Sequence, residues 1–249
     1  MKSNIQALIL FTLLCCVAIT APASELTDAA LNGELQKVQE LIDKGADVNK
    51  ATSNGVTLLH IASENGHLDV VKLLLEAKAD VNKATTNGVT SLHIASQHDH
   101  LDVVKLLLAA EADVNKATID GVTPLYISSQ YGHHDAVKLL LEAKADVNKS
   151  KSNGATPLYM ASQNGHPEAV KLLLAAEADV NKAKTNGVTP LHISAQQGHS
   201  AVVKLLLAAK ANVLAIAQAN GEGYTALRIA TLKEHKEIIE LLEKYGEND

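Results

Sequence analysis

The sequence predicts an all-α solenoid of about seven helix-turn-helix units with β-turn fingers, and three observations support this fold class. Thr57, Thr90, Thr123, Thr156 and Thr189 stand 33 residues apart, and Thr225 follows after a 36-residue step. Each of these threonines opens two short apolar segments separated by a turn. Only 2% of the residues are aromatic and none is Trp, so the core must consist of Leu, Val, Ile and Ala, which suit thin stacked layers of small helices.

The first 23 residues have the pattern of a secretory signal peptide. Lys2 gives a positive start, residues 7–19 are nearly all apolar, and Ala21, Pro22 and Ala23 form a small-residue cleavage site. The apolar run is shorter than the roughly 20 residues that a membrane-spanning helix needs. We therefore expect cleavage after Ala23, a secreted or periplasmic location, and no membrane contact by the mature chain. Both cysteines lie in this segment, so the mature chain would contain no disulfide.

The mature chain, residues 24–249, divides by its period into capping and internal units. Residues 24–50 form an N-terminal capping unit that has a helix pair but no threonine opening. Residues 219–249 form a C-terminal capping repeat, in which Arg228 and Glu234 replace the usual His or Tyr and the turn Gly. Terminal repeats need such polar residues because one side has no neighbour. The internal repeats are expected at 51–83, 84–116, 117–149, 150–182 and 183–218.

Caps and turns predict the order of elements within an internal unit. The threonine is a good helix N-cap, and a Pro directly after it is tolerated because that amide has no helical partner. The first helix therefore begins at the threonine, and a Gly-His pair marks the turn. A Val-Val-Lys-Leu-Leu-Leu run then gives the second helix its buried stripe. Asn-Gly pairs such as Asn87-Gly88 indicate tight turns in the fingers between units.

Several motifs recur together at this period: Thr-Pro-Leu-His at 189–192 and its variants, the Gly-His turn, and Ala-Asp-Val-Asn at the end of most units. This combination resembles the ankyrin-repeat family over residues 24–249. The resemblance implies a chain that binds another protein through a concave face formed by finger tips and first helices, without a cofactor. It also implies that the Thr-Pro-Leu-His histidine points inward and bonds to neighbouring hydroxyl or backbone groups, and that Tyr126 and Tyr159 replace it.

The sequence departs from the family pattern at the end of the second helix. The family usually places Gly there in a left-handed conformation, and only Gly45 follows that rule. Lys78, Glu111, Lys144, Glu177 and Lys210 occupy the equivalent positions. We expect each to have positive φ, at a cost of roughly 1 kcal/mol, and Asp99 to take a turn position usually given to Gly. The segment from Asn212 to Tyr224 contains the three-residue insertion and is expected to be the least regular finger.

Nine of the eleven histidines recur at the period and are therefore expected to belong to the scaffold. His98 and His134 lie outside these ladders, beside His100 and His133 on the turns of two adjacent repeats. A remote alternative is a metal-dependent enzyme that uses these four histidines. Zinc requires each ligating nitrogen within about 2.1 Å, and solvated turn histidines are much commoner, so we expect no metal.

Charge and residue chemistry argue against other function classes. The formal net charge is −6, whereas nucleic acids and anionic membranes require clustered positive charge. A lysine recurs once in each second helix, and four of these lysines have an acid three residues earlier, which indicates a solvated outer face. The Ser, His and Asp residues recur as interchangeable copies, and no phosphate-binding glycine loop is present. We therefore expect a monomer without enzyme activity.

The resemblance carries partner-binding roles onto particular positions of the fingers and first helices. These are Glu64, Val89, Gln97, His98, Ile119, Asp120, Val122, Gln130, Tyr131, Gln163, Asn164, Gln196, Gln197 and Tyr224. Ile119 and Tyr131 break the repeat and form a candidate hot spot, although neutral drift on a polar surface is the alternative. The leading hypothesis is an exported scaffold that modulates or protects a partner protein. The alternative is a secreted effector that acts on a protein of a host or target cell.

Overall fold

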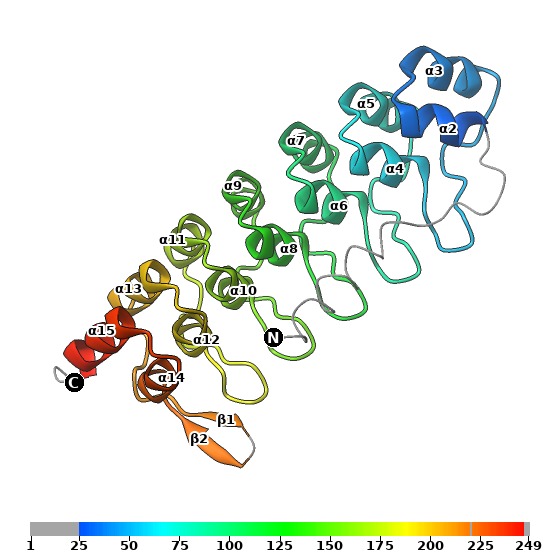
Figure 1. Ribbon diagram of the computed structural model, residues 1–249. Coiled ribbons are helices and arrows are strands. Elements are labelled where there is room, and N and C mark those ends of the chain that lie inside the picture. The colour runs from blue at the N-terminus through cyan, green and yellow to red at the C-terminus, as the bar shows by residue number, and fades with distance from the viewer. Residues whose placement is uncertain (1–24, 220, 247–249) are drawn as a thin grey trace.

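The computed structural model describes residues 25–219 and 221–246, which form a row of stacked helix pairs (Figure 1). The predicted fold class, an all-α solenoid with fingers, is confirmed. The first helices of the pairs are α2 (Glu25–Asn32), α4 (Leu58–Glu64), α6 (Ser91–Gln97), α8 (Pro124–Tyr131), α10 (Pro157–Asn164), α12 (Pro190–Gln197) and α14 (Ala226–Leu232). The second helices are α3 (Leu35–Asp43), α5 (Leu68–Glu76), α7 (Leu101–Ala109), α9 (His134–Glu142), α11 (Pro167–Ala175), α13 (Ser200–Ala208) and α15 (Lys236–Gly246).

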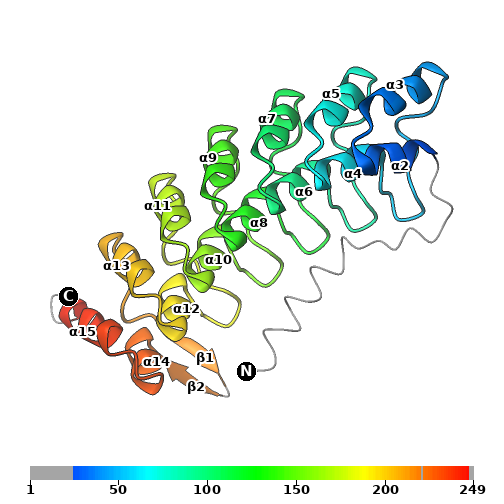
Figure 2. The same cartoon turned by 45° about the horizontal axis from the view of Figure 1, so that its top comes forward.

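The two kinds of helix form separate layers. First helices lie side by side in one row and second helices in another, and the fingers extend from the row of first helices (Figure 2). We call the side formed by the fingers and first helices the finger face, and the side formed by the second helices the back face. None of the helices within the described residues is long and apolar enough to cross a membrane.

Threonine caps begin the first helices, as the sequence predicts. Thr123 is extended at φ −107° and ψ 165°, and its Oγ1 accepts a hydrogen bond from the backbone N–H of Tyr126 at 3.1 Å. Pro124 follows at the first helical position, where its missing N–H costs nothing. The same N-cap role falls to Thr57, Thr90, Thr156, Thr189 and Thr225.

Aliphatic side chains fill the space between the layers. Each internal repeat buries one leucine from its first helix and one from its second, such as Leu92 and Leu107, at 1% exposure or less. Fully burying a leucine side chain contributes about 1.5–3 kcal/mol, so the repeated leucines carry much of the hydrophobic stabilisation. One continuous core cluster runs from Leu26 to Leu242, which explains how the fold stands without Trp.

Adjacent repeats are joined by equivalent hydrogen bonds at each junction. In the fingers, the backbone N–H of Thr86 donates to the carbonyl of Asn54 at 2.9 Å, and the same bond recurs along the row. Below the fingers, Asn49 accepts the backbone N–H of Asp80 through Oδ1 at 2.7 Å. Because these bonds repeat every 33 residues, each repeat sits in nearly the same register on its neighbour.

The expected left-handed residues are confirmed. Lys78, Glu111, Lys144, Glu177 and Lys210 have φ between 62° and 68°, and Asp99 has φ 57°. Gly45, at the equivalent position of the first unit, has φ 88°.

The last finger corrects a prediction, since it is a hairpin instead of the least regular loop. Strands β1 (Ala217–Ala219) and β2 (Glu222–Tyr224) pair antiparallel, with Ala217 opposite Tyr224. The inserted residues give this finger room for the strand pair. Arg228 holds β2 by donating to the carbonyl of Gly223 at 3.1 Å and by lying over the Tyr224 ring at 4.5 Å from its centroid.

Candidate functional site

The buried histidines of the first helices are part of the scaffold. Nδ1 of His60 accepts a bond from the backbone N–H of Thr57 at 3.1 Å, and its Nε2 donates to the carbonyl of Val89 in the next repeat at 3.2 Å. This arrangement fits a neutral ring with its hydrogen on Nε2. Burial lowers the pKa of His93, in the same position one repeat later, to about 4. These histidines bond as the family resemblance implies, and both ring nitrogens are used in hydrogen bonds within and between repeats.

Tyrosines replace this histidine in the two central repeats and create a second hydrophobic cluster on the finger face. Tyr126 and Tyr159 are 6% and 4% exposed, and burial raises the pKa of each phenol to about 12. Val122, Ile127, Ala155 and Ile193 complete the cluster, and the partly buried Tyr131, Met160 and Val188 pack against it. Lys184 lies 5.3 Å from the centroid of the Tyr159 ring, a cation–π geometry. The central repeats therefore have a buried apolar layer directly beneath the finger face.

The histidines of the Gly-His turns also join repeats. They are His67, His100, His133, His166, His199 and His235, and each bonds through Nε2 to a backbone carbonyl of the preceding repeat. His166, for example, donates from Nε2 to the carbonyl of Gln130 at 3.1 Å, 36 residues earlier. Its ring lies so close to Gly132 that a Cβ there would be 2.5 Å from Nδ1, so a side chain at this position would force the ring to move. Asp99 and Glu234 replace this glycine, and the carboxylate of Asp99 lies 3.7 Å from Nδ1 of His133.

The four histidines of the metal alternative do not form a ligand set. His98 stacks on His100 with ring centroids 6.0 Å apart, while Nε2 of His100 is bonded to the carbonyl of Glu64 at 2.9 Å. His133 is likewise bonded to the carbonyl of Gln97, and His134 points to Asp135 at 3.8 Å. Within residues 25–219 and 221–246, no three His, Cys, Asp or Glu side chains are arranged to hold a metal. The geometry therefore gives the metal-dependent enzyme alternative no support.

Most of the predicted partner-binding residues reach the surface. His98, Ile119, Asp120, Asn164, Gln196 and Gln197 are exposed, and Glu64, Val89, Gln97, Gln130, Tyr131, Gln163 and Tyr224 are half-buried. Ile119 stands out because 78% of it is exposed at a finger tip. Val122 corrects the prediction, since it is only 1% exposed. Its side chain belongs to the second hydrophobic cluster beside Tyr126, so it supports the face from below.

The pattern of repeats also points to two candidate residues of the finger face, Met160 and Leu232, that the predicted set omits. Met160 replaces an isoleucine that recurs at Ile61, Ile94, Ile127 and Ile193, and it is more exposed than these four. Leu232 occupies the position of Gln196 in the last repeat and is 65% exposed. Each differs from the residue that recurs at its position in the other repeats, which is the same signal that identified Ile119.

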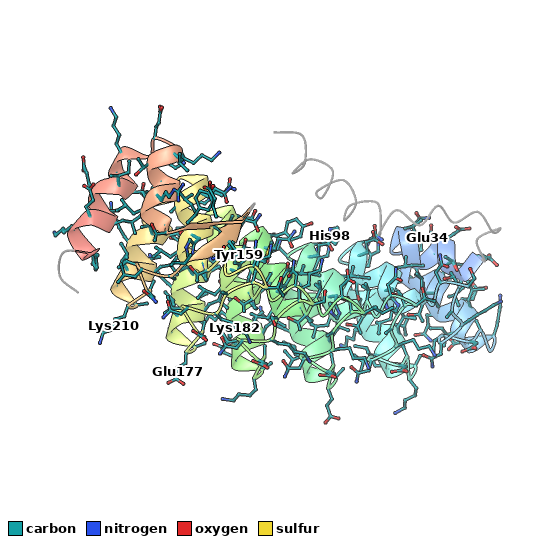
Figure 3. The ribbon with its side chains drawn as sticks, turned by 90° about the horizontal axis from the view of Figure 1, so that it is seen from below. Glu34, His98, Tyr159, Glu177, Lys182 and Lys210 are labelled. Carbon is teal, nitrogen blue, oxygen red and sulfur yellow. The ribbon has the colours of Figure 1, made fainter. Side chains whose placement is uncertain are left out.

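Lysine–acid pairs lie on the second helices, which form the back face. Of the four lysine–acid pairs expected within second helices, two are formed, Lys105 with Asp102 at 3.1 Å and Lys171 with Glu168 at 3.9 Å. Figure 3 shows His98 on one long edge of the solenoid and Glu177 and Lys210 on the opposite edge.

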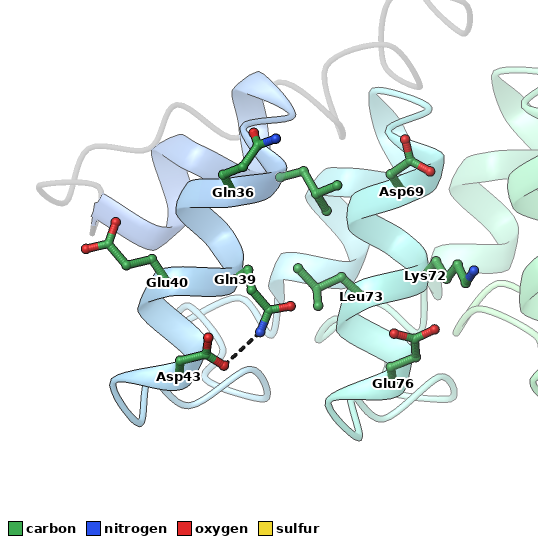
Figure 4. Close-up of a pocket in the computed structure, with 9 residues that line it drawn as sticks. Gln36, Gln39, Glu40, Asp43, Asp69, Lys72, Leu73 and Glu76 are labelled. Atoms are coloured by element: carbon green, nitrogen blue, oxygen red, sulfur yellow. Dashed lines mark hydrogen bonds between the residues drawn. The ribbon is translucent and has the colours of Figure 1, made fainter.

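The back face also has an open groove of about 630 Å³ between α3 and α5 (Figure 4). Its lining is mixed. Leu35 and Leu73 contribute apolar area, and polar groups come from Gln36, Gln39, Lys72 and four acidic side chains, Glu40, Asp43, Asp69 and Glu76. Glu40 and Lys72 lie at opposite ends of the groove (Figure 4).

Comparison with protein families gives one result. A family model described as ankyrin repeats in three copies matches residues 26–118, 113–184 and 176–249. Comparison with curated proteins finds no match to the chain.

Proposed function

Because the chain belongs to the ankyrin-repeat family, we propose that it is an exported scaffold that modulates or protects a partner protein bound on its finger face. Ankyrin repeats form protein–protein interaction scaffolds, and the family is typically not enzymatic. The finger face is the side that the resemblance assigns to recognition. Export is supported by the signal-peptide pattern of residues 1–23, which lie outside the described residues.

One observation carries the choice of the central repeats as the binding site. Ile119 is 78% exposed on the finger of the unit that also contains Tyr131, and Tyr131 packs against the second hydrophobic cluster. The unit therefore combines an exposed apolar finger tip with a partly exposed tyrosine, and tyrosine is enriched among the residues that dominate binding energy in protein interfaces. In the other fingers that lack the insertion, the equivalent residues are Ser53, Thr86, Ser152 and Thr185, which offer less apolar area.

A pull-down with the purified protein, followed by mass spectrometry, identifies the partner, and variants then test the site. We expect Tyr131→Ala combined with Ile119→Ser to weaken the partner's affinity by about tenfold or more. The matched control is Tyr245→Ala with Leu68→Ser, which removes an aromatic and an apolar side chain of about 40% exposure from second helices. Affinity retained within about twofold in the finger-face variant would contradict the site.

Export has its own test. N-terminal sequencing of the protein from the periplasm or medium should begin at Ser24, directly after the proposed cut. Retention in the periplasm would disfavour the alternative of a secreted effector. A chain that stays in the cytoplasm with Met1 in place would refute export.

A further inference from the structure

A column of side-chain amides runs along the finger face. Gln97, Gln130, Gln163 and Gln196 occupy the same position, near the end of the first helix, in four consecutive repeats. They follow the isoleucine and methionine column by three residues, so both columns lie on the same side of their helices. That side faces the fingers, because Ile127 and Ile193 of this column pack in one cluster with the finger residues Val122 and Ala155.

The amides are held at regular intervals and are available for binding. The backbone carbonyl of each of these glutamines accepts a bond from the histidine of the following repeat, as His199 does to Gln163 at 3.1 Å. Within the described residues, the four side-chain amides themselves make no hydrogen bond. A glutamine amide both donates and accepts hydrogen bonds, which matches the N–H and C=O groups of a polypeptide backbone.

The spacing of the column matches an extended chain. Neighbouring helices pack about 8–10 Å apart, and an extended strand advances about 3.3 Å per residue, so each repeat corresponds to about three residues of a bound segment. A helix would advance only about 1.5 Å per residue and would meet the column at a different period.

The ends of the column differ from its middle. Glu64 occupies the equivalent position in the first full repeat, and Leu232 occupies it in the last. The Glu64 carboxylate is half-buried and has no cation within ion-pair distance among the described residues, and burial raises its pKa. Leu232 is 65% exposed. Charges that border the middle are already engaged, since Lys151 lies 3.7 Å from Asp120 and Lys184 lies over Tyr159.

We propose that the column from Glu64 to Leu232 binds an extended segment of the partner protein, about 15 residues long and uncharged along its middle. A lysine or arginine of that segment lies beside Glu64, and an apolar side chain lies beside Leu232. Between them, the glutamine amides pair with the backbone of the segment, and Met160 and Val188 contact its apolar side chains. This inference rests on the proposed scaffold function and specifies the chemistry of the partner.

Selection from a phage-displayed library of random peptides of about 16 residues tests this chemistry against the purified protein. The expected pool is depleted of charged residues along the middle and enriched in Lys or Arg at one end. A synthetic, fluorescein-labelled member of the pool then gives affinities by anisotropy. Failure to enrich any peptide, or enrichment of peptides with apolar residues at helical i, i+3 and i+4 spacing, would overturn the proposal.

Two substitutions test the contacts of the selected peptide. We expect Gln163→Glu to weaken it by about tenfold, because a carboxylate cannot donate to a backbone carbonyl. Gln36→Glu is the matched control, since it makes the same change at an exposed position of α3 on the back face and should act within about twofold. Equal effects of the two substitutions would overturn the proposal.

The charged end has a separate test. Glu64→Gln should weaken the selected peptide but not its analogue in which Gln replaces the terminal Lys or Arg, and equal losses for both peptides would contradict the contact. A further outcome is that no peptide binds while the protein captures a folded partner that depends on Ile119 and Tyr131. That outcome refutes the extended segment and leaves the scaffold function supported. If the protein binds neither a peptide nor a folded partner, both the extended segment and the scaffold function are refuted.

Discussion

Removal of a single buried hydroxyl group should stabilise the protein. Ser63, Ser96 and Ser162 occupy the same position in three first helices and are fully buried, and their hydroxyl oxygens have no hydrogen-bond partner among the residues that the structure describes. Burying a hydroxyl without a bond costs about 1–3 kcal/mol. Ser162→Ala removes that cost and leaves a space no larger than one water, roughly 10–15 Å³, which costs about 0.2–0.4 kcal/mol at about 24 cal/mol per Å³. We expect a net gain of about 1 kcal/mol or more.

Thermal unfolding followed by circular dichroism measures this gain. For a chain of this size, 1 kcal/mol corresponds to a rise in Tm of about 2–4 °C. Ser129→Ala is the matched control, because Ser129 stands in the same column but donates its hydroxyl to the carbonyl of Leu125 at 2.7 Å. That variant should be neutral or less stable by about 1 kcal/mol. The reasoning fails if Ser162→Ala does not raise Tm, or if Ser129→Ala raises it equally. Ala195 already fills this position in another repeat at 0% exposure.

Three further predictions concern backbone strain, acid and metal. Lys144→Gly should raise Tm, because Lys144 has φ 68° and a side chain there costs roughly 1 kcal/mol, and an unchanged or lower Tm would contradict this. The fold lowers the pKa of His93 from 6.5 to about 4, so its contribution is present above pH 6.5 and is lost as pH falls toward 4, by about 3 kcal/mol in total. His93→Tyr should therefore move the acid-unfolding midpoint, followed by circular dichroism, to lower pH, and no movement would refute the assignment. Titration of zinc into the protein should give no saturable binding heat in calorimetry. A saturable signal that disappears in His98→Ala would instead support a metal site at His98 and His134.

Local rules predicted the repeated features of the fold well. Thr123 caps its helix because an N-cap needs only a hydroxyl and the next three residues. Lys144 is left-handed because the chain must leave the second helix in the same way as at Gly45. These features depend on neighbours in sequence, and a period of 33 repeats the same neighbours in every unit.

Features that depend on contacts between repeats were harder to predict. The finger position of Val122 predicts a surface residue, but its side chain packs in the second hydrophobic cluster with Tyr126 and is buried. The hairpin of the last finger depends on where Arg228 directs its guanidinium group, and no local rule states that. The exposure of Met160 likewise depends on how its neighbours pack.

The bonds at each junction have a consequence for the length of the chain. Asn115 accepts the N–H of Asp146, and Asn148 accepts that of Asp179, each through Oδ1. If residues 117–149 were deleted, Asn115 would meet Asp179, an aspartate in the same local setting as its present partner. The two repeats brought together by the deletion would therefore present complementary donor and acceptor groups. Duplication of a unit would likewise create an interface with the same pair of groups. Such a protein can lose or gain a whole repeat in one genetic event, and the new interface between repeats still forms the same hydrogen bonds.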